Sequence, residues 1–182
     1  QTMPFWTKSS DSEVGRMSKI LVEENNLYEL DCTAALWATD QIHEEYHRAK
    51  TNLKDADFLI ETEEQMLLVE YKNSNVPNAA NPGAFDPEKK ANDVVQKFYD
   101  SLHYLYLLGK SKPVCYIWVL ESEKSDLTIR KRLRNRLYKA LPFLLQENIG
   151  DGKKLIEGVD VVSIAEWNAD QRYGRYPLRK RN

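Results

Sequence analysis

The sequence predicts an α/β protein with a mixed β-sheet that contains one antiparallel hairpin and is flanked by helices. Apolar residues recur at helical spacing in several segments, and short apolar runs lie between these segments. Two of the short runs are separated only by a polar turn, which is typical of a hairpin. Helices that alternate with strands around one sheet define the α/β class, and the hairpin makes the sheet mixed.

The elements follow from local signals along the chain. Ser10 with Glu13 forms a capping-box pattern that begins a helix, and Asp86 followed by Pro87 begins another, which Gly109 closes. The run 114–120 is long enough for a buried strand and too short to cross a membrane. The predicted helices are 10–21, 33–50, 86–109 and 126–141, the last interrupted before Pro142, and the predicted strands are 57–61, 65–72, 114–120 and 159–164. A long loop spans 73–86.

Composition favours one globular domain over the 182 residues, with 1–10 and 170–182 flexible or peripheral. The formal net charge is −2, so any nucleic-acid surface has to be a local patch. Cys32 and Cys115 fit no metal-binding spacing, which suggests buried thiols in a reducing compartment. Because no signal-peptide pattern is evident either, we expect a cytoplasmic protein with no membrane partner.

Charged residues at the end of an otherwise apolar strand indicate a functional site. Residues 66–69 are apolar on both faces, as in a central strand, yet Glu70 and Lys72 follow on one face. Asp57 opens the neighbouring strand and can lie near Glu70 if the hairpin is tightly paired. Two carboxylates at one sheet end repel each other unless a cation lies between them, and Mg²⁺ prefers such oxygen ligands. The other interpretation is a structural ion pair of Glu70 with Lys72.

The Asp57…Glu70-x-Lys72 pattern resembles the PD-(D/E)xK nuclease superfamily, the restriction-endonuclease-like fold. The resemblance covers chiefly residues 57–72, with Ala56 in place of the proline of the family motif. It implies that Asp57 and Glu70 bind Mg²⁺ or Mn²⁺, and that Lys72 orients or activates the attacking water. The implied function is hydrolysis of phosphodiester bonds, with DNA favoured over RNA as substrate. A protein of this fold that binds nucleic acid or a protein partner without cutting it is the alternative.

The helix before the hairpin carries the stretch HEEYH, residues 43–47. His43 and His47 with Glu44 match a short zinc-peptidase pattern, which makes a zinc metallopeptidase a third hypothesis. Both histidines, however, point away from the apolar stripe of the helix, as expected for a solvated face. Glu45 lies closer to that stripe and is our candidate for the metal-supporting glutamate that the resemblance implies on this helix, with Glu13 as its competitor.

A basic helix supplies a candidate nucleic-acid surface. Within 130–139, six basic residues occur without an acidic one. Such a cluster suits contacts with phosphates, although a solvated helix face is an equal alternative. The candidate nucleic-acid-binding residues are Arg130, Arg132, Arg134, Arg136 and Lys139, and the C-terminal arginines around Tyr173 and Tyr176 are a further cluster. The sequence leaves a homodimer open.

Overall fold

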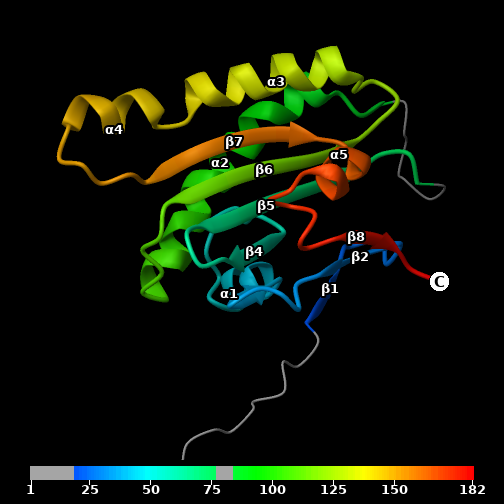
Figure 1. The fold of residues 1–182 in the computed structure, drawn as a ribbon, viewed down its shortest axis with the longest axis horizontal. Coiled ribbons are helices and arrows are strands. Elements are labelled where there is room, and N and C mark those ends of the chain that lie inside the picture. The colour runs from blue at the N-terminus through cyan, green and yellow to red at the C-terminus, as the bar shows by residue number, and fades with distance from the viewer. Residues whose placement is uncertain (1–18, 77–83) are drawn as a thin grey trace, which may run out of the picture.

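A five-stranded mixed sheet forms the centre of the protein (Figure 1). The computed structural model describes residues 19–76 and 84–182. The strand order is β3-β4-β5-β6-β7, where β3 and β4 are antiparallel to their neighbours and β5, β6 and β7 are parallel. The strands are β3 Trp37–Thr39, β4 Phe58–Glu61, β5 Met66–Asn73, β6 Val114–Glu121 and β7 Ile156–Val162. The predicted mixed sheet with one antiparallel hairpin is therefore confirmed.

The hairpin of β4 and β5 has the register that its pattern predicts. Phe58 lies opposite Val69 and Glu61 lies opposite Met66. Thr62 closes the turn, since its backbone N–H donates to the Gln65 carbonyl at 2.9 Å and its hydroxyl accepts from the Gln65 N–H at 3.0 Å. This register places residue 57, just before β4, beside residue 70 near the end of β5.

Both faces of the central strands are covered, as the continuous apolar runs predict. On one face, Leu68 and Tyr116 belong to a core built with α1 Ile42–Arg48, α2 Pro87–Leu107, α3 Leu127–Ala140 and α4 Phe143–Ile149. On the other face, Val69 and Ile117 pack with α5 Ile164–Ala169 and with a small antiparallel sheet. That sheet has the order β1-β2-β8, formed by β1 Ile20–Val22, β2 Tyr28–Asp31 and β8 Leu178–Lys180 (Figure 1).

Helix α2 begins and ends as predicted. The Asp86 side chain accepts a hydrogen bond from the Glu88 N–H at 3.0 Å, which caps the first turn. Gly109 follows the last turn with φ of 67°, a left-handed conformation that favours glycine. The basic helix α3 begins after Asp126 and stops before Pro142, after which α4 continues the chain. The position of α2 is important for the site because this helix covers the end of the hairpin.

Two predicted helices differ from the structure. Of the predicted helix 10–21, residues 10–18 lie outside the described residues, and Ile20–Val22 form strand β1. The predicted helix 33–50 is shorter, since only Ile42–Arg48 is helical and Trp37–Thr39 form the edge strand β3. Pairing of Ala38 with Ile60 outweighs the helix propensity of the alanines at 34, 35 and 38, so tertiary pairing decides this segment.

The C-terminal segment is packed rather than loose. Of the two expected peripheral ends, residues 1–10 lie outside the described residues. Tyr173 is fully buried and stacks on Trp167 of α5, with ring centroids 5.0 Å apart, while β8 pairs with β2. Tyr173 and Tyr176 are therefore core residues and not part of an exposed basic surface.

Both cysteines are free and buried, as expected. Among the helices of residues 19–76 and 84–182, none is long and apolar enough to cross a lipid bilayer.

Candidate active site

A cleft of about 750 Å³ opens where β5 approaches its end and β4 begins. Asp57, Glu70 and Lys72, the three residues of the predicted motif, all line it. Its other walls come from the β1–β2 turn, the start of α1 and one flank of α2. The structure therefore places all three residues on the wall of one concave site, as expected for residues that bind a ligand.

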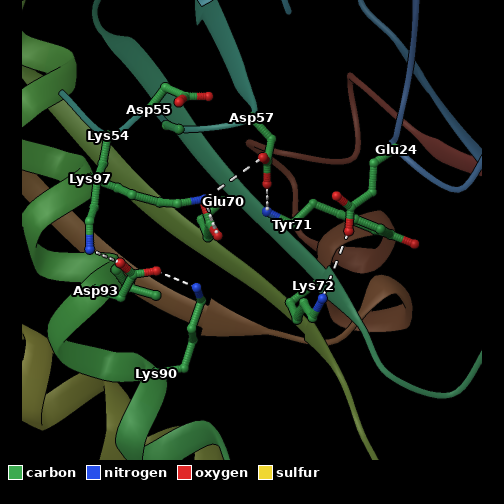
Figure 2. A network of polar contacts seen from close by, with 12 residues as sticks. Glu24, Lys54, Asp55, Asp57, Glu70, Tyr71, Lys72, Lys90, Asp93 and Lys97 are labelled. Atoms are coloured by element: carbon green, nitrogen blue, oxygen red, sulfur yellow. Dashed lines mark hydrogen bonds and ion pairs between the residues drawn. The ribbon is translucent and has the colours of Figure 1, made fainter. Parts of the chain in front are cut away.

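Asp57 is held in place by the neighbouring strand. Its Oδ2 atom accepts a hydrogen bond from the backbone N–H of Tyr71 at 2.6 Å (Figure 2). This bond ties the Asp57 carboxylate to the residue that follows Glu70. The hairpin register thus fixes both carboxylates at the same end of the sheet.

The cation between these carboxylates is an ammonium group. Lys97 reaches from α2, and its Nζ atom lies 2.8 Å from both carboxylate oxygens of Glu70 and 4.0 Å from Oδ1 of Asp57 (Figure 2). The Glu70 side chain is only 3% exposed and that of Lys97 is 18% exposed. Lys97 therefore supplies the positive charge that the paired carboxylates require.

Burial and mutual charge shift the pKa of all three groups. Burial and the nearby Asp57 charge raise the pKa of Glu70 to about 8, against the opposing effect of Lys97. Burial also raises the pKa of Asp57, which Lys97 and the Tyr71 N–H partly counteract. Burial disfavours the Lys97 ammonium, but Glu70 and Asp57 outweigh burial and raise its pKa. A cluster of strongly shifted groups in a cleft is typical of functional sites.

Lys72 lies apart from the two carboxylates. Its Nζ atom is 3.8 Å from Oε1 of Glu24 in the β1–β2 turn, and its side chain is 35% exposed (Figure 2). Glu23, which is buried, shapes this turn by accepting hydrogen bonds from the N–H groups of Asn25 at 2.7 Å and Leu27 at 2.6 Å. Lys72 thus lines the cleft but contacts its rim, and Lys97 takes the place beside Glu70.

Helix α2 also positions the segment that carries Asp57. The backbone N–H of Ala56 donates to Ser101 Oγ at 2.9 Å, and that of Lys54 donates to Asp100 Oδ2 at 2.9 Å. Tyr46 of α1 donates to the Asp100 carbonyl at 2.6 Å, which links the two helices. Residues 54–56 have no strand partner, so these bonds satisfy their backbone and fix the approach to Asp57.

The cleft is acidic in total. Four lysines line it, among them Lys54 and Lys90, which both pair with Asp93 of α2. Its eight carboxylates are those of Glu23, Glu24, Asp40, Glu44, Asp55, Asp57, Glu70 and Asp93. A site with this excess of carboxylates favours cations and disfavours a bare phosphate.

Glu45 does not reach this cleft. It pairs with Arg48 at 3.7 Å along α1, and its side chain is 48% exposed. Glu44, the preceding residue, lines the cleft instead. The apolar stripe of α1 faces α2, where Tyr46 donates to the Asp100 carbonyl, so a position near this stripe does not bring Glu45 to the cleft. The competing residue Glu13 lies outside the described residues.

The two histidines of the HEEYH stretch lie on an exposed helix face, as predicted. The His43 side chain is 68% exposed and its Nδ1 atom lies 3.2 Å from Oδ1 of Asp55, while the rings of His43 and His47 stack at 6.4 Å. In the part of the chain that the structure describes, no group of three His, Cys, Asp or Glu side chains is arranged to hold a metal ion. The third ligand that a zinc peptidase requires is therefore not present among these residues.

The basic helix lies on the far flank of α2. Glu88 and Asn92 of α2 face α3, whereas Lys90, Asp93 and Lys97 of the same helix face the cleft. At 100° per residue, these two sets of side chains point in nearly opposite directions.

The positive charge of helix α3 is largely paired with acidic residues of the protein. Arg130 pairs with Glu166 through two hydrogen bonds of 3.0 Å, Arg132 and Arg136 pair with Glu88, and Arg134 lies 3.9 Å from Asp160. Lys131 and Lys139 are exposed and make no ion pair with a described residue.

Asp57 and Glu70 have the chemistry of a Mg²⁺ or Mn²⁺ site. Mg²⁺ is commonly held by one or two carboxylates, with water and substrate oxygens completing its shell. The Lys97 ammonium shows that the space between them accepts a cation. The residues therefore fit the metal that the resemblance implies, provided that Lys97 moves from Glu70.

Comparison of the chain with protein-family models, with curated proteins and with solved structures finds no match.

Proposed function

We propose that this protein is a metal-dependent nuclease of the restriction-endonuclease-like class, with Asp57 and Glu70 as ligands of Mg²⁺ or Mn²⁺. One observation carries the proposal: two carboxylates from adjacent strands share a single cation at the floor of a cleft. Placing a second carboxylate beside the buried Glu70 is costly unless a cation lies between them, which is typical of a site that uses a cation.

The strand order supports the same class. The resemblance implies a further strand before the Asp-bearing strand, and β3 occupies that position at the edge of the sheet. After the hairpin, α2 crosses over to β6, which lies parallel to β5. This chain differs from the element order that the resemblance implies, because helix α1 lies between β3 and β4 in the sequence.

The residues of the cleft account for the steps of phosphodiester hydrolysis. A bound divalent ion would lower the pKa of a water molecule and stabilise charge on the phosphate. Asp57 and Glu70 would hold that ion, and the lysines of the cleft would orient the water and the phosphate. Because the cleft is otherwise acidic, we expect nucleic acid to bind productively only when the divalent ion is present. DNA is the favoured substrate, and the free buried thiols suit a cytoplasmic protein.

A non-catalytic binding protein is the second candidate. The observation in its favour is that Lys97 satisfies both oxygens of Glu70, which completes the pair without any metal. In that case the Asp57–Lys97–Glu70 group would be a structural element of the fold. Nucleic acid or a protein partner would then bind elsewhere on the surface.

Cleavage assays separate the two candidates. The purified protein is incubated with labelled single- and double-stranded DNA and RNA in the presence of Mg²⁺, Mn²⁺ or EDTA. We expect cleavage of at least one substrate with a divalent ion and none with EDTA. Binding without cleavage across all four substrates in Mg²⁺ and Mn²⁺ would favour the non-catalytic protein.

A further inference from the structure

We infer that Lys97 is a built-in counter-ion of the site, which a divalent metal ion must displace from Glu70 in order to bind. Lys97 and the metal therefore compete for the same carboxylate, and Lys97, not Lys72, is the lysine coupled to metal binding. The inference rests on the proposed function only in that it takes Asp57 and Glu70 as metal ligands.

Both oxygens of Glu70 are already engaged by one cation. Both of its carboxylate oxygens accept from the Lys97 ammonium at 2.8 Å, and its side chain is almost entirely buried. An ion that binds between Asp57 and Glu70 would have to enter the space that this ammonium fills. The two cations would also repel each other at such short separation in a poorly solvated position.

The side chain of Lys97 can leave without unfolding the site. It extends from α2 toward the cleft and is 18% exposed, so its flexible stem can carry the ammonium toward solvent (Figure 2). The carboxylate of Asp55, which lines the same cleft and contacts only the exposed His43 among the described ion pairs, is a group to which it could move. A displaced Lys97 would remain in the cleft, where it could contact a phosphate or the attacking water.

The other lysines of the cleft are engaged elsewhere. Lys72 contacts Glu24 at 3.8 Å, and Lys54 and Lys90 are paired with Asp93. None of these three makes an ion pair with Glu70 among the described contacts. Removing any of them changes the total charge of the cleft, but only removal of Lys97 vacates the space between the two carboxylates.

Calorimetric titration with Mn²⁺ tests this competition directly. We compare the wild-type protein with Lys97→Met and Lys72→Met at mildly alkaline pH, where protons compete least for the carboxylates. We expect Lys97→Met to bind Mn²⁺ about tenfold more tightly than wild type, because no ammonium has to be displaced. We expect the affinity of Lys72→Met to change by less than about threefold, since only long-range charge is lost.

The outcomes separate the inference from the proposed function. Equal or weaker Mn²⁺ binding by Lys97→Met would overturn the competition while leaving the metal site intact. Tighter binding by Lys97→Met would support the competition even if no nucleic acid is cleaved. Absence of Mn²⁺ binding in all three proteins would overturn the competition and the metal site together.

A second measurement covers the case in which Lys97→Met does not fold. In wild-type protein with ¹³C-labelled lysine, the Lys97 Cε–Hε signal is assigned by its loss in Lys97→Arg and followed during titration with Mg²⁺. We expect this signal to shift at the Mg²⁺ concentrations that fill the site, while the Lys89 signal, from an exposed residue of α2, stays in place. A Lys97 signal that does not respond to Mg²⁺ would contradict displacement.

Discussion

The Lys97 ammonium lies 2.8 Å from both carboxylate oxygens of Glu70, and this single lysine from α2 is the cation that Glu70 shares with Asp57 at the end of the β4–β5 hairpin. Helix α2 thereby has two roles at the cleft. It supplies the cation, and through Asp100 and Ser101 it fixes the segment that carries Asp57. The site depends on how this helix packs against the sheet as much as on the hairpin itself.

Ser101→Ala tests the positioning role of α2. The substitution leaves the buried N–H of Ala56 without its hydrogen-bond partner, which costs about 1–3 kcal/mol. We expect a lower free energy of unfolding in urea and reduced cleavage, because the approach to Asp57 loosens. The control is Ser111→Ala, an exposed residue, which we expect to leave both quantities unchanged. Wild-type stability and activity in Ser101→Ala would show that this bond does not position Asp57.

Glu61 provides a prediction about pH. Its hydrogen bond from Lys110, together with Lys112 at 3.1 Å, lowers the pKa of Glu61 below its ordinary value of 4.5. A lowered pKa in the folded state contributes stability that is present above pH 4.5 and is lost as pH falls through the folded-state pKa. We expect Glu61→Gln to cost about 1 kcal/mol at neutral pH and progressively less in acid.

The measurement is the free energy of unfolding of wild type and of Glu61→Gln, from neutral pH to well below pH 4.5. Glu63→Gln, in the exposed turn beside it, is the control and should follow the wild-type curve. A difference between wild type and Glu61→Gln that stays constant down to the lowest pH would refute the assignment.

The histidines of α1 are expected to be dispensable for metal binding. Both are exposed, and the described residues offer them no third ligand. The double variant His43→Ala, His47→Ala should keep the metal content of wild type and lose no more than about 0.5 kcal/mol of stability. Zinc measured by mass spectrometry in stoichiometric amount in wild type, and lost in the double variant, would instead identify a zinc site.

Lys131 and Lys139 of helix α3, which make no ion pair with a described residue, test the predicted nucleic-acid surface. If this helix contacts phosphates of duplex DNA, Lys131→Ala with Lys139→Ala should reduce the slope of log affinity against log salt by about 1.8. The matched control is Lys153→Ala with Lys154→Ala, an exposed pair in the loop between α4 and β7. An unchanged slope in the α3 variant would show that its charge, like that of the paired arginines, serves only the fold and solvation.

The hairpin could be predicted because its physical signals are local. Apolar residues on both faces of 66–69, a polar turn at 62–64 and the charges at Glu70 and Lys72 are all visible within a few residues. The N-cap at Asp86 and the stop at Gly109 are equally local. For these elements, sequence periodicity and turn chemistry agree with the final packing.

The remaining features depend on tertiary contacts. Strands β1, β2 and β8 have three or four residues each, too few to establish a period, and β2 pairs with the distant β8. Lys97 lies on the amphipathic helix α2. The pattern of this helix predicts its buried face, but it does not predict which of its two flanks lies beside the hairpin. A signal was present in the polar series Lys90, Asp93 and Lys97, spaced three and four residues apart on one flank of α2.

The most direct test of the central claim is the rate of Mn²⁺-dependent nucleic-acid cleavage by wild type and by Glu70→Gln, with Glu45→Gln as the control. Removing the Glu70 charge should lower the rate by at least about a hundredfold, because the metal loses one of its two carboxylate ligands. Glu45→Gln, which lies outside the cleft, should cleave like wild type. A folded Glu70→Gln protein that cleaves at the wild-type rate would contradict the assignment of Asp57 and Glu70 as the metal site.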